Sequence, residues 1–284
     1  ATTTVEGIKI QIGRTGTLTP VAVLRSVEVG GIKITHATLH NFDQIKRLDV
    51  REGDTVIVSR AGDVIPQITK VLKEMRNGKE KPFKIPAKCP IDGSKVNKEG
   101  AIYRCSNPRC GARHTESLRH FVSRGAFNLE GLGPKIMDRF LDEGLISDAA
   151  DIFDLKEGDI AVLERFGKKS AENIVNEISR KKKIILPRFI YSLGILHIGE
   201  ETANVLAKEI SREKISGPAS VLSALKKMSL ENLQEIPDIG PKVAQSVFDW
   251  CRDANNADFI GKLEKAGITV EDLKPSVSNR KLKG

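Results

Sequence analysis

Cysteine and aromatic residues are scarce in this chain of 284 residues, which holds four cysteines, one tryptophan and two tyrosines. Four cysteines are too few for a disulfide scaffold at this length, so a reducing compartment fits best. Three of them, Cys89, Cys105 and Cys110, fall within 22 positions of one another. The fourth, Cys251, stands in VFDWCRD and is expected to be a buried helix thiol.

Long hydrophobic runs are also missing. The most apolar stretch, IILPRFIYSLGILHI, is interrupted by Pro187 and Arg188. It is too short and too broken to cross a bilayer, so no membrane association is predicted.

Acidic residues are outnumbered, because 46 Lys and Arg face 37 Asp and Glu and give a formal charge of +9. From charge alone, the chain could simply be a basic protein. A polyanionic partner, most often a nucleic acid, is the sharper interpretation.

The residue pattern divides the chain into parts and predicts a multidomain fold. Residues 1–75 alternate apolar and polar, as in GIKIQIG, and predict about five strands with a helix starting near Thr38. Such a segment fits a small all-β barrel of the OB-fold type. Residues 76–115 hold a charged linker and the cysteine cluster, residues 116–275 read as all-α, and residues 276–284 form a polar, basic tail.

An internal repeat organises the helical half. When four glycines are placed in register, apolar residues recur four and one positions before each glycine and four and seven positions after it. The spacing predicts a helix, a tight hairpin with an apolar plug, and a second helix that opens at the glycine. This helix-hairpin-helix pattern occurs at Gly133, Gly167, Gly199 and Gly240.

Glycine-rich hairpins of this kind suit phosphate binding. Main-chain N–H groups without a nearby Cβ lie at a helix N-terminus, where the helix dipole favours an anion. Because no base edge is read, binding should not depend on sequence. The alternative is a helical array whose glycines merely allow close packing.

The four copies differ in charge after the glycine. Copy one has Lys135 after Pro134, copy two has Lys168 and Lys169, and copy four has Lys242 after Pro241. Gly131, two positions before the glycine of copy one, is also a predicted DNA contact. Copy three has Glu200 and Glu201, which would repel phosphate. Copies one, two and four are therefore predicted to contact DNA, and copy three to be mainly structural.

Two loops of the expected barrel place an arginine beside a flexible glycine: Arg14 and Thr15 in GRTG, and Arg60, Val64 and Ile65 in SRAGDVIP. They could be ordinary turns, and Val64 and Ile65 could be core residues or an apolar tip in a minor groove. Phe42 is the only aromatic residue in positions 1–75, so contact with a duplex backbone is favoured over base stacking on a single strand.

The order of these parts resembles the C-terminal half of bacterial NAD-dependent DNA ligase over almost the whole chain. The stretches that carry the resemblance are IGRTGTLTPVA, THATLHN, RLDVREGDTV, RAGDVIPQI, the C-x-N-x-x-C knuckle, SLGILHIGEETA and IPDIGPKVAQS. The resemblance implies a bacterial cytoplasmic, nucleoid-associated, monomeric enzyme of DNA repair and replication that seals nicks in duplex DNA with NAD and Mg²⁺. It also implies that the barrel loops contact DNA near the nick.

The adenylated lysine of the family lies in a K-x-D-G motif, which this sequence lacks. The resemblance therefore implies an inactive fragment without its adenylation and BRCT domains, NAD and Mg²⁺ being bound by the missing domains. The alternative is a free-standing helix-hairpin-helix module that binds branched or nicked DNA without ligation. A zinc-knuckle interaction protein without a nucleic-acid role is disfavoured by the four hairpins.

The knuckle departs from the family pattern C-P-x-C at one ligand position, because CPID places Asp92 there. Structural zinc wants four ligands, and a carboxylate oxygen is acceptable though less common. Asp92 is thus the first candidate to complete Cys89, Cys105 and Cys110, and His114 is the second. Water as fourth ligand, or no metal, are the remaining alternatives.

Overall fold

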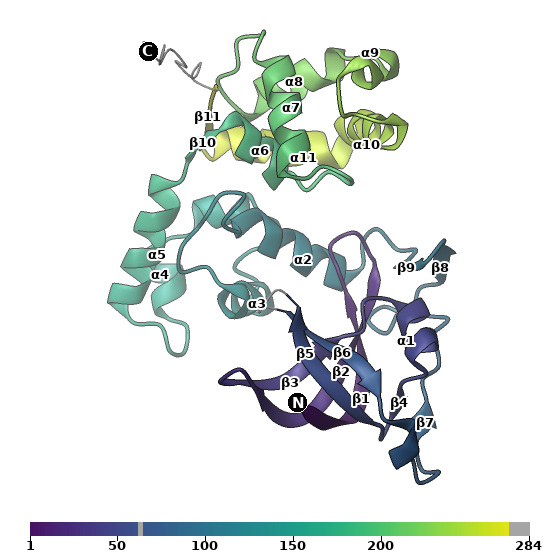
Figure 1. The fold of residues 1–284 in the computed structure, drawn as a ribbon. Coiled ribbons are helices and arrows are strands. Elements are labelled where there is room, and N and C mark those ends of the chain that lie inside the picture. Colours follow the sequence, from purple (N-terminus) through teal and green to yellow (C-terminus); the bar gives the residue numbers. More distant parts are fainter. Residues whose placement is uncertain (62–64, 273–284) are drawn as a thin grey trace, which may run out of the picture. The chain divides into compact units, whose positions relative to one another are not determined.

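The computed structural model describes residues 1–61 and 65–272, and the chain divides into two units, residues 1–116 and 117–284. Each unit has its own hydrophobic core. Figure 1 labels the helices and strands of both units. No helix of the described residues is long and apolar enough to cross a membrane.

The first unit is a closed five-stranded barrel with strand order β1-β2-β3-β6-β5, and β5 pairs back to β1. This confirms the predicted small barrel. Its strands are β1 (Thr2–Ile12), β2 (Leu18–Val29), β3 (Ile32–Thr38), β5 (Thr55–Ala61) and β6 (Ile65–Val71). In β1, Lys9 and Gln11 are exposed while Ile12 is buried, as the alternation predicts.

The helix of the barrel, α1 (Phe42–Leu48), begins four residues after the expected Thr38, which ends β3. The Asn41 side chain caps it by accepting the Gln44 N–H at 2.9 Å. Phe42 is 1% exposed in the core, so the one aromatic residue of the barrel offers no stacking surface. Burying it contributes roughly 1.5–3 kcal/mol to stability.

Residues 76–86, expected to be a charged linker, pack on the barrel instead. β7 (Lys81–Pro82) pairs with β4 (Arg51–Glu52), after the short 3-10 helix η1 (Lys73–Met75). The Arg76 guanidinium donates to the buried Asp54 carboxylate at 2.7 Å and to Asp49 at 2.8 Å. The ion pairs of Arg76 with Asp54 and Asp49 hold this segment on the barrel. The pattern of apolar residues could not predict these polar contacts.

The cysteine cluster belongs to the same unit. The hairpin β8 (Val96–Glu99) and β9 (Ile102–Cys105) carries one cysteine, and all three lie in the core cluster of the barrel. Tyr103 meets the Phe42 ring edge-on at 4.8 Å, and Thr17 of the barrel bridges to Arg104. The knuckle is thus fixed to the barrel.

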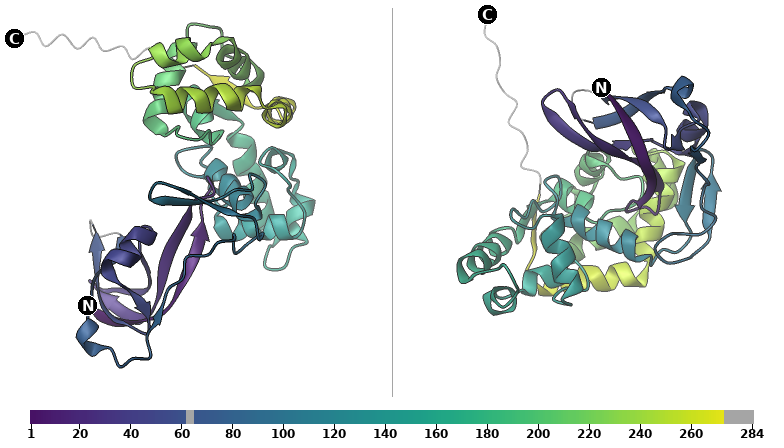
Figure 2. Two further views of the ribbon diagram at one scale, coloured as in Figure 1. Left: turned by 90° about the vertical axis from the view of Figure 1, so that its right-hand side faces the viewer. Right: turned by 90° about the horizontal axis from the view of Figure 1, so that it is seen from below.

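The second unit is helical, as predicted, with one small parallel pair of strands, β10 (Lys183–Ile185) and β11 (Thr269–Glu271) (Figure 2). α2 runs into it from the knuckle. The helices are α2 (Gly111–Val122), α3 (Pro134–Asp142), η2 (Asp151–Asp154), α4 (Glu157–Ala161), α5 (Lys168–Arg180), α6 (Leu186–Ser192), α7 (Glu200–Ile210), α8 (Pro218–Lys227), α9 (Leu230–Glu235), α10 (Pro241–Arg252) and α11 (Ala254–Lys265).

The repeat read from the sequence forms the core of this unit. The residues four positions after each glycine, Met137, Ala171, Ala203 and Ala244, are completely buried. Cys251 of α10 is also completely buried, and burial raises the pKa of its thiol to about 11. The predicted buried helix thiol is therefore confirmed.

Candidate nucleic-acid interface and metal centre

The four glycine hairpins share one backbone conformation. They span residues 129–133 (hairpin one), 163–167 (two), 195–199 (three) and 236–240 (four). In each, the residue before the glycine donates its N–H to the residue four before the glycine, at 3.0–3.2 Å. The third residue of each hairpin is left-handed: Gly131 (φ 86°), Arg165 (71°), His197 (68°) and Asp238 (66°).

Each hairpin glycine is the N-cap of the following helix. Gly133, Gly167, Gly199 and Gly240 precede α3, α5, α7 and α10 in extended conformation, and no side chain of the cap residue bonds to the first turn. The first N–H groups of a helix have no intrahelical acceptor. They form a ready site for an anion at the positive end of the helix dipole.

Close packing does not explain these glycines. A Cβ placed on any of the four would meet no heavy atom within 4 Å, and none of the four has positive φ. A side chain at any of these four positions would therefore not clash with the described structure. The lack of a side chain leaves room for an external group, so the close-packing alternative loses its physical basis.

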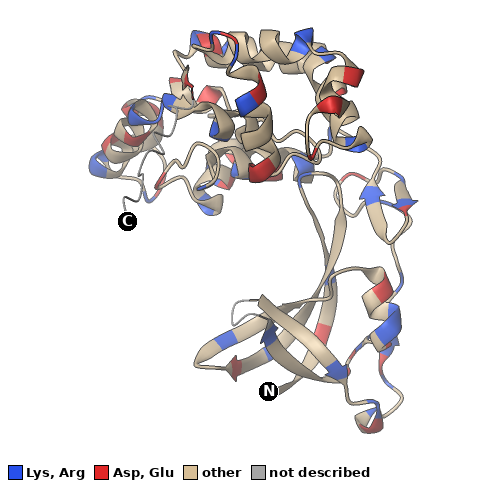
Figure 3. Cartoon of the chain, turned by 45° about the horizontal axis from the view of Figure 1, so that its top comes forward, with Lys and Arg blue, Asp and Glu red and all other residues tan. Residues whose placement is uncertain are grey.

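The surroundings of the hairpins differ in charge. Lys135, Lys168 and Lys242 are exposed and make no ion pair within the part of the chain that the structure describes. Lys169 is 79% exposed on its side chain and lies 3.1 Å from Glu172. Lys and Arg are interspersed with Asp and Glu over the helices of the second unit (Figure 3), so charge alone does not single out one face of these helices.

One of the two acidic residues that follow hairpin three lies against another loop of the same unit. A Cβ on Gly125 would lie 2.6 Å from Glu200 Oε1, so this carboxylate packs against the loop that follows α2. Leu196 and His197 at its tip are exposed. The first turn of α7 is thus the one hairpin helix start that carries two acidic residues, Glu200 and Glu201, among the described helices.

Hairpin one adjoins a hollow of about 320 Å³ lined by Arg124, Gly131 and Gly133, among others. Arg124 is exposed. The repeat register could not single it out, because Arg124 lies in the loop before the hairpin, where no copy-to-copy correspondence exists.

The predicted barrel residues are only partly described. Ile65 opens β6 and is 55% exposed, which excludes the core alternative for it. Arg60 lies half-buried in β5, opposite Pro66. Val64 lies outside the described residues. The two arginines, Thr15 and the apolar tip stay predictions as DNA contacts.

Thr15 has a partner within its own unit. Arg104 Nη1 donates to Thr15 Oγ1 at 2.8 Å, to the Thr15 carbonyl at 3.0 Å and to Thr17 Oγ1 at 2.8 Å. Arg104 thereby fixes the GRTG loop to the knuckle. This role could not be predicted, because Arg104 and Thr15 are 89 positions apart in the sequence.

The four predicted metal ligands meet at one point. The ligand atoms of Cys89, Asp92, Cys105 and Cys110 all lie within 4.8 Å of one another. Cys89 Sγ lies 3.9 Å from Cys110 Sγ, and Cys105 Sγ lies 3.7 Å from both oxygens of Asp92. Tetrahedral zinc with Zn–S bonds of about 2.3 Å requires ligands separated by about 3.8 Å. The donor set therefore fits a tetrahedral metal.

Asp92 is oriented for this task. Its carboxylate accepts the Ser94 N–H at 3.0 Å and the Asn107 side-chain amide at 2.8 Å. Such hydrogen bonds to a ligand fix its direction. They also lower the pKa of Asp92, chiefly through the Ser94 N–H, so the carboxylate is anionic at neutral pH.

The cysteines are protected from solvent, each being at most 3% exposed. Burial raises the pKa of Cys89 to about 12 and raises that of Cys105 as well. His114 is exposed on α2 and is not among the residues that gather at this point. The described structure therefore favours Asp92 over His114 as the fourth ligand.

Comparisons with known proteins agree with the geometry. Residues 2–80 match the family model described as the NAD-dependent DNA ligase OB-fold domain. Residues 126–180 match a SAM-like helix-hairpin-helix tandem, and residues 188–260 match a helix-hairpin-helix motif. The two units are thus an OB-fold barrel and a helix-hairpin-helix array.

Curated relatives extend the similarity to nearly the whole chain. The DNA ligase of Nitrosococcus oceani is 45% identical over 273 residues, which cover 95% of this chain and 39% of that protein. The DNA ligase of Koribacter versatilis is 44% identical over 278 residues, and that of Coxiella burnetii is 46% identical over 269 residues. The chain belongs to the NAD-dependent DNA ligases as a C-terminal portion. It spans about two fifths of the length of these curated relatives.

Proposed function

We propose that this chain is the part of an NAD-dependent DNA ligase that grips nicked duplex DNA through its backbone phosphates, independent of sequence. The observation that carries the proposal is the fourfold hairpin with an open glycine at the start of each second helix. Main-chain N–H groups at these points suit phosphate oxygens and read no base.

Hairpins one, two and four supply the phosphate contacts in this proposal. Their helix starts combine open N–H groups with Lys135, Lys168, Lys169 and Lys242. Hairpin three, with Gly199, serves the fold, because Glu200 and Glu201 would place negative charge beside a phosphate.

The barrel adds Arg14, Arg60 and Ile65 at its loops, and the bond from Arg104 to Thr15 holds one of these loops in shape. These residues position the duplex and contribute no reacting group. The chemistry of nick sealing, with NAD and Mg²⁺, belongs to the complete ligase. The chain alone should be inactive, because the K-x-D-G lysine motif is not in its sequence. The proposed setting is DNA repair and replication in the bacterial cytoplasm at the nucleoid, with the chain as a monomer.

We further propose that the metal centre is a structural zinc site formed by Cys89, Asp92, Cys105 and Cys110. Bound zinc would supply a crosslink between the loop of residues 89–94 and the start of α2. The three cysteines and Asp92 would hold it, while Ser94 and Asn107 orient the carboxylate.

Zinc content measured by mass spectrometry tests the fourth ligand. Asp92→Ala should lower the zinc content, whereas Asp92→Cys should retain it and resist a chelator longer, because thiolate binds zinc more strongly than carboxylate. His114→Ala is the matched control and should retain full zinc. Unchanged zinc in Asp92→Ala would remove Asp92 from the ligand set.

Fluorescence anisotropy with labelled nicked and intact duplexes, over a series of salt concentrations, tests DNA binding. Binding should occur to any sequence and weaken steeply as salt rises, since released counterions drive it. Failure to bind duplex DNA in dilute buffer would overturn the proposal.

A further inference from the structure

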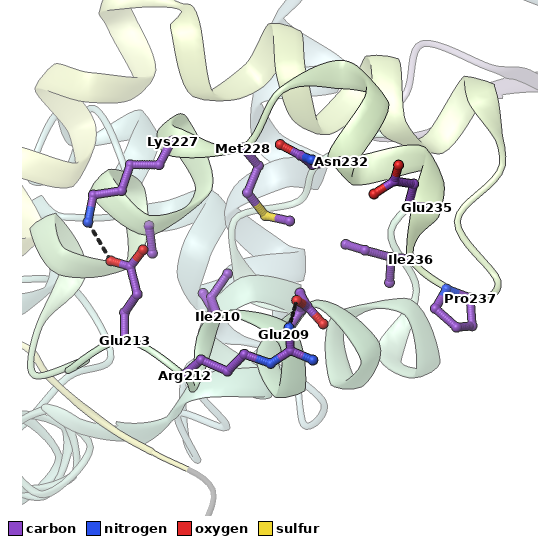
Figure 4. Close-up of a pocket in the computed structure, with 11 residues that line it drawn as sticks. Glu209, Ile210, Arg212, Glu213, Lys227, Met228, Asn232, Glu235, Ile236 and Pro237 are labelled. Carbon is purple, nitrogen blue, oxygen red and sulfur yellow. Dashed lines mark hydrogen bonds and ion pairs between the residues drawn. The ribbon is translucent and has the colours of Figure 1, made fainter.

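A groove in the second unit is lined by none of the four hairpin glycines. It has a volume of about 570 Å³ and lies among the end of α7, α8 and α9 (Figure 4). Ile210, Ala224 and Ile236 form an apolar floor together with the half-buried Met228. Grooves with apolar floors and a few polar groups on the rim are the usual form of a binding site.

The rim is acidic in a chain that is otherwise basic. Three glutamates, Glu209, Glu213 and Glu235, face two cations. Both cations are already used, since Arg212 pairs with Glu209 at 2.5 Å and Lys227 pairs with Glu213 at 2.7 Å. Glu235 is exposed and makes no ion pair among the residues that the structure describes. The groove thus offers one uncompensated carboxylate above an apolar floor.

The described chain ends beside this groove. Asp272, its last residue, accepts a hydrogen bond from Ser211 Oγ at 2.5 Å. Ser211 stands between Ile210 and Arg212, which both line the groove. Asp272 is therefore close to two residues that line the groove.

Residues 273–284 read LKPSVSNRKLKG. They contain four basic residues and no acidic one, with Leu273, Val277 and Leu282 interspersed. Twelve residues can span at most about 40 Å, which is enough to reach across a groove close to Asp272. Their charge and apolar content complement the acidic rim and apolar floor.

We propose that residues 273–284 dock into this groove of their own chain, with apolar side chains on Met228 and Ile236 and a basic side chain at Glu235. The proposal does not rest on the proposed function. It places the basic segment next to Pro237, which lines the groove and belongs to hairpin four. A docked segment would add positive charge beside that hairpin.

Methyl NMR of the full chain tests the docking, because the chain has three methionines in different places. Met228 lines the groove, Met137 is completely buried in the helical core, and Met75 is exposed in the first unit. Changing Lys274, Arg280, Lys281 and Lys283 to Gln, and Val277 and Leu282 to Ser, should shift the Met228 methyl signal. The signals of Met137 and Met75 should stay in place.

Two further comparisons keep the test decisive. Glu235→Gln should shift the Met228 signal toward its position in the neutral-tail variant, whereas Glu231→Gln on the same helix should not. Raising the salt to about 1 M, where charges are screened beyond about 3 Å, should have the same effect as Glu235→Gln. An unmoved Met228 signal in the neutral-tail variant would overturn the proposal. A Met228 signal that depends on protein concentration would also overturn it, because the segment would then occupy a second copy.

Discussion

Three helices of the second unit, α3, α8 and α10, each have a glycine N-cap followed by a proline, and yet α8 and α10 differ at their N-termini. At α8, the Glu264 carboxylate accepts the Ala219 N–H at 2.9 Å, and a Cβ on Gly217 would lie 2.9 Å from both of its oxygens. At α10, nothing lies within 4 Å of a Cβ on Gly240. One helix start is filled by an internal anion, and the other is open.

The filled helix start shows what the open ones can hold. A carboxylate at α8 occupies the position that the dipole and the unpaired N–H groups favour. The hairpin helices α3, α5 and α10 present the same arrangement without an internal anion, so a phosphate oxygen can take that place. The difference separates a helix start whose N–H groups are bonded within the chain from one that is open to an external anion.

Capping the open N-termini of α3, α5 and α10 with side chains should produce the largest effect, a loss of affinity for duplex DNA. Replacing Gly133, Gly167 and Gly240 together by Ser places a hydroxyl at each N-cap, where it accepts the free N–H groups and stabilises the helix. Three lost phosphate contacts at about 1 kcal/mol each predict a loss of duplex affinity on the order of 100-fold. Anisotropy measures this loss, and melting of the variant should occur at or above the wild-type temperature.

The matched control is Gly217→Ser at the filled start of α8. It should leave duplex affinity within about twofold of wild type, while the crowding against Glu264 lowers stability. Equal losses of affinity in the control and in the triple variant would erase the distinction between filled and open starts.

Removing the charge of Glu264, the anion at the start of α8, should have a smaller effect, on the free energy of unfolding. Glu264→Gln keeps the shape of the side chain and loses the charge at the start of α8, which predicts a loss of about 0.5–1 kcal/mol in unfolding free energy. Trp250, the only tryptophan of the chain, lies in α10 and reports unfolding of this unit by fluorescence. Glu235→Gln, whose carboxylate caps no helix start, should change stability by less. A stability unchanged in Glu264→Gln would show that the contact is not a cap.

Charge at the open starts should tune the salt dependence. Lys169→Glu at hairpin two should reduce the slope of log affinity against log salt by about 0.9, the share of one phosphate contact. Lys208→Glu, at the far end of α7 behind hairpin three, should change it less. Anisotropy titrations at five salt concentrations measure both slopes. Equal changes in the two variants would contradict the ranking of the hairpins.

The repeat and the barrel could be predicted from sequence because both depend on apolar periodicity. The buried Met137, Ala171, Ala203 and Ala244 follow the register of the glycines without exception. The left-handed turn residues could not be predicted, since one of the four, Gly131, is a glycine and the others are Arg165, His197 and Asp238. The tertiary hairpin imposes this conformation on them.

Contacts between polar groups far apart in the sequence could not be predicted either. The Glu264 cap of α8 joins residues 45 positions apart, and Arg104 reaches Thr15 across 89 positions. Asp92 could be predicted as a ligand because it stands at a cysteine position of the knuckle pattern. Its support by Asn107 follows only from the folded loop.

The smallest expected effect is on the stability of the barrel, where the Asp49 carboxylate is paired with cationic side chains instead of main-chain N–H groups. Arg76, followed by Arg51 and Lys73, lowers the pKa of Asp49 below its usual value. A carboxyl with a lowered folded-state pKa stabilises the fold above its unfolded pKa of about 3.9 and loses that contribution as pH falls further. Because the Asp49 side chain is 40% exposed, we expect the effect to stay below about 1 kcal/mol.

Hydrogen exchange of β5 between pH 3 and pH 6 measures this effect. Asp49→Asn should weaken protection at pH 6 and weaken it less at pH 3, which lies below the unfolded pKa of Asp49 but still above its lowered folded pKa. The exposed Asp43→Asn should leave protection unchanged at both pH values. Unchanged protection at pH 6 in Asp49→Asn would rule out the ionised Asp49 as a source of stability.

Amide NMR during titration with nicked duplex DNA observes the main-chain N–H groups that we propose bind phosphate. The amide signals of Lys135, Lys168 and Lys242, at the open starts of α3, α5 and α10, should shift on binding. The amide signal of Ala219, bonded to Glu264 at the filled start of α8, should remain in place. Bound DNA that leaves the three lysine amides unmoved would contradict phosphate binding at the open helix starts.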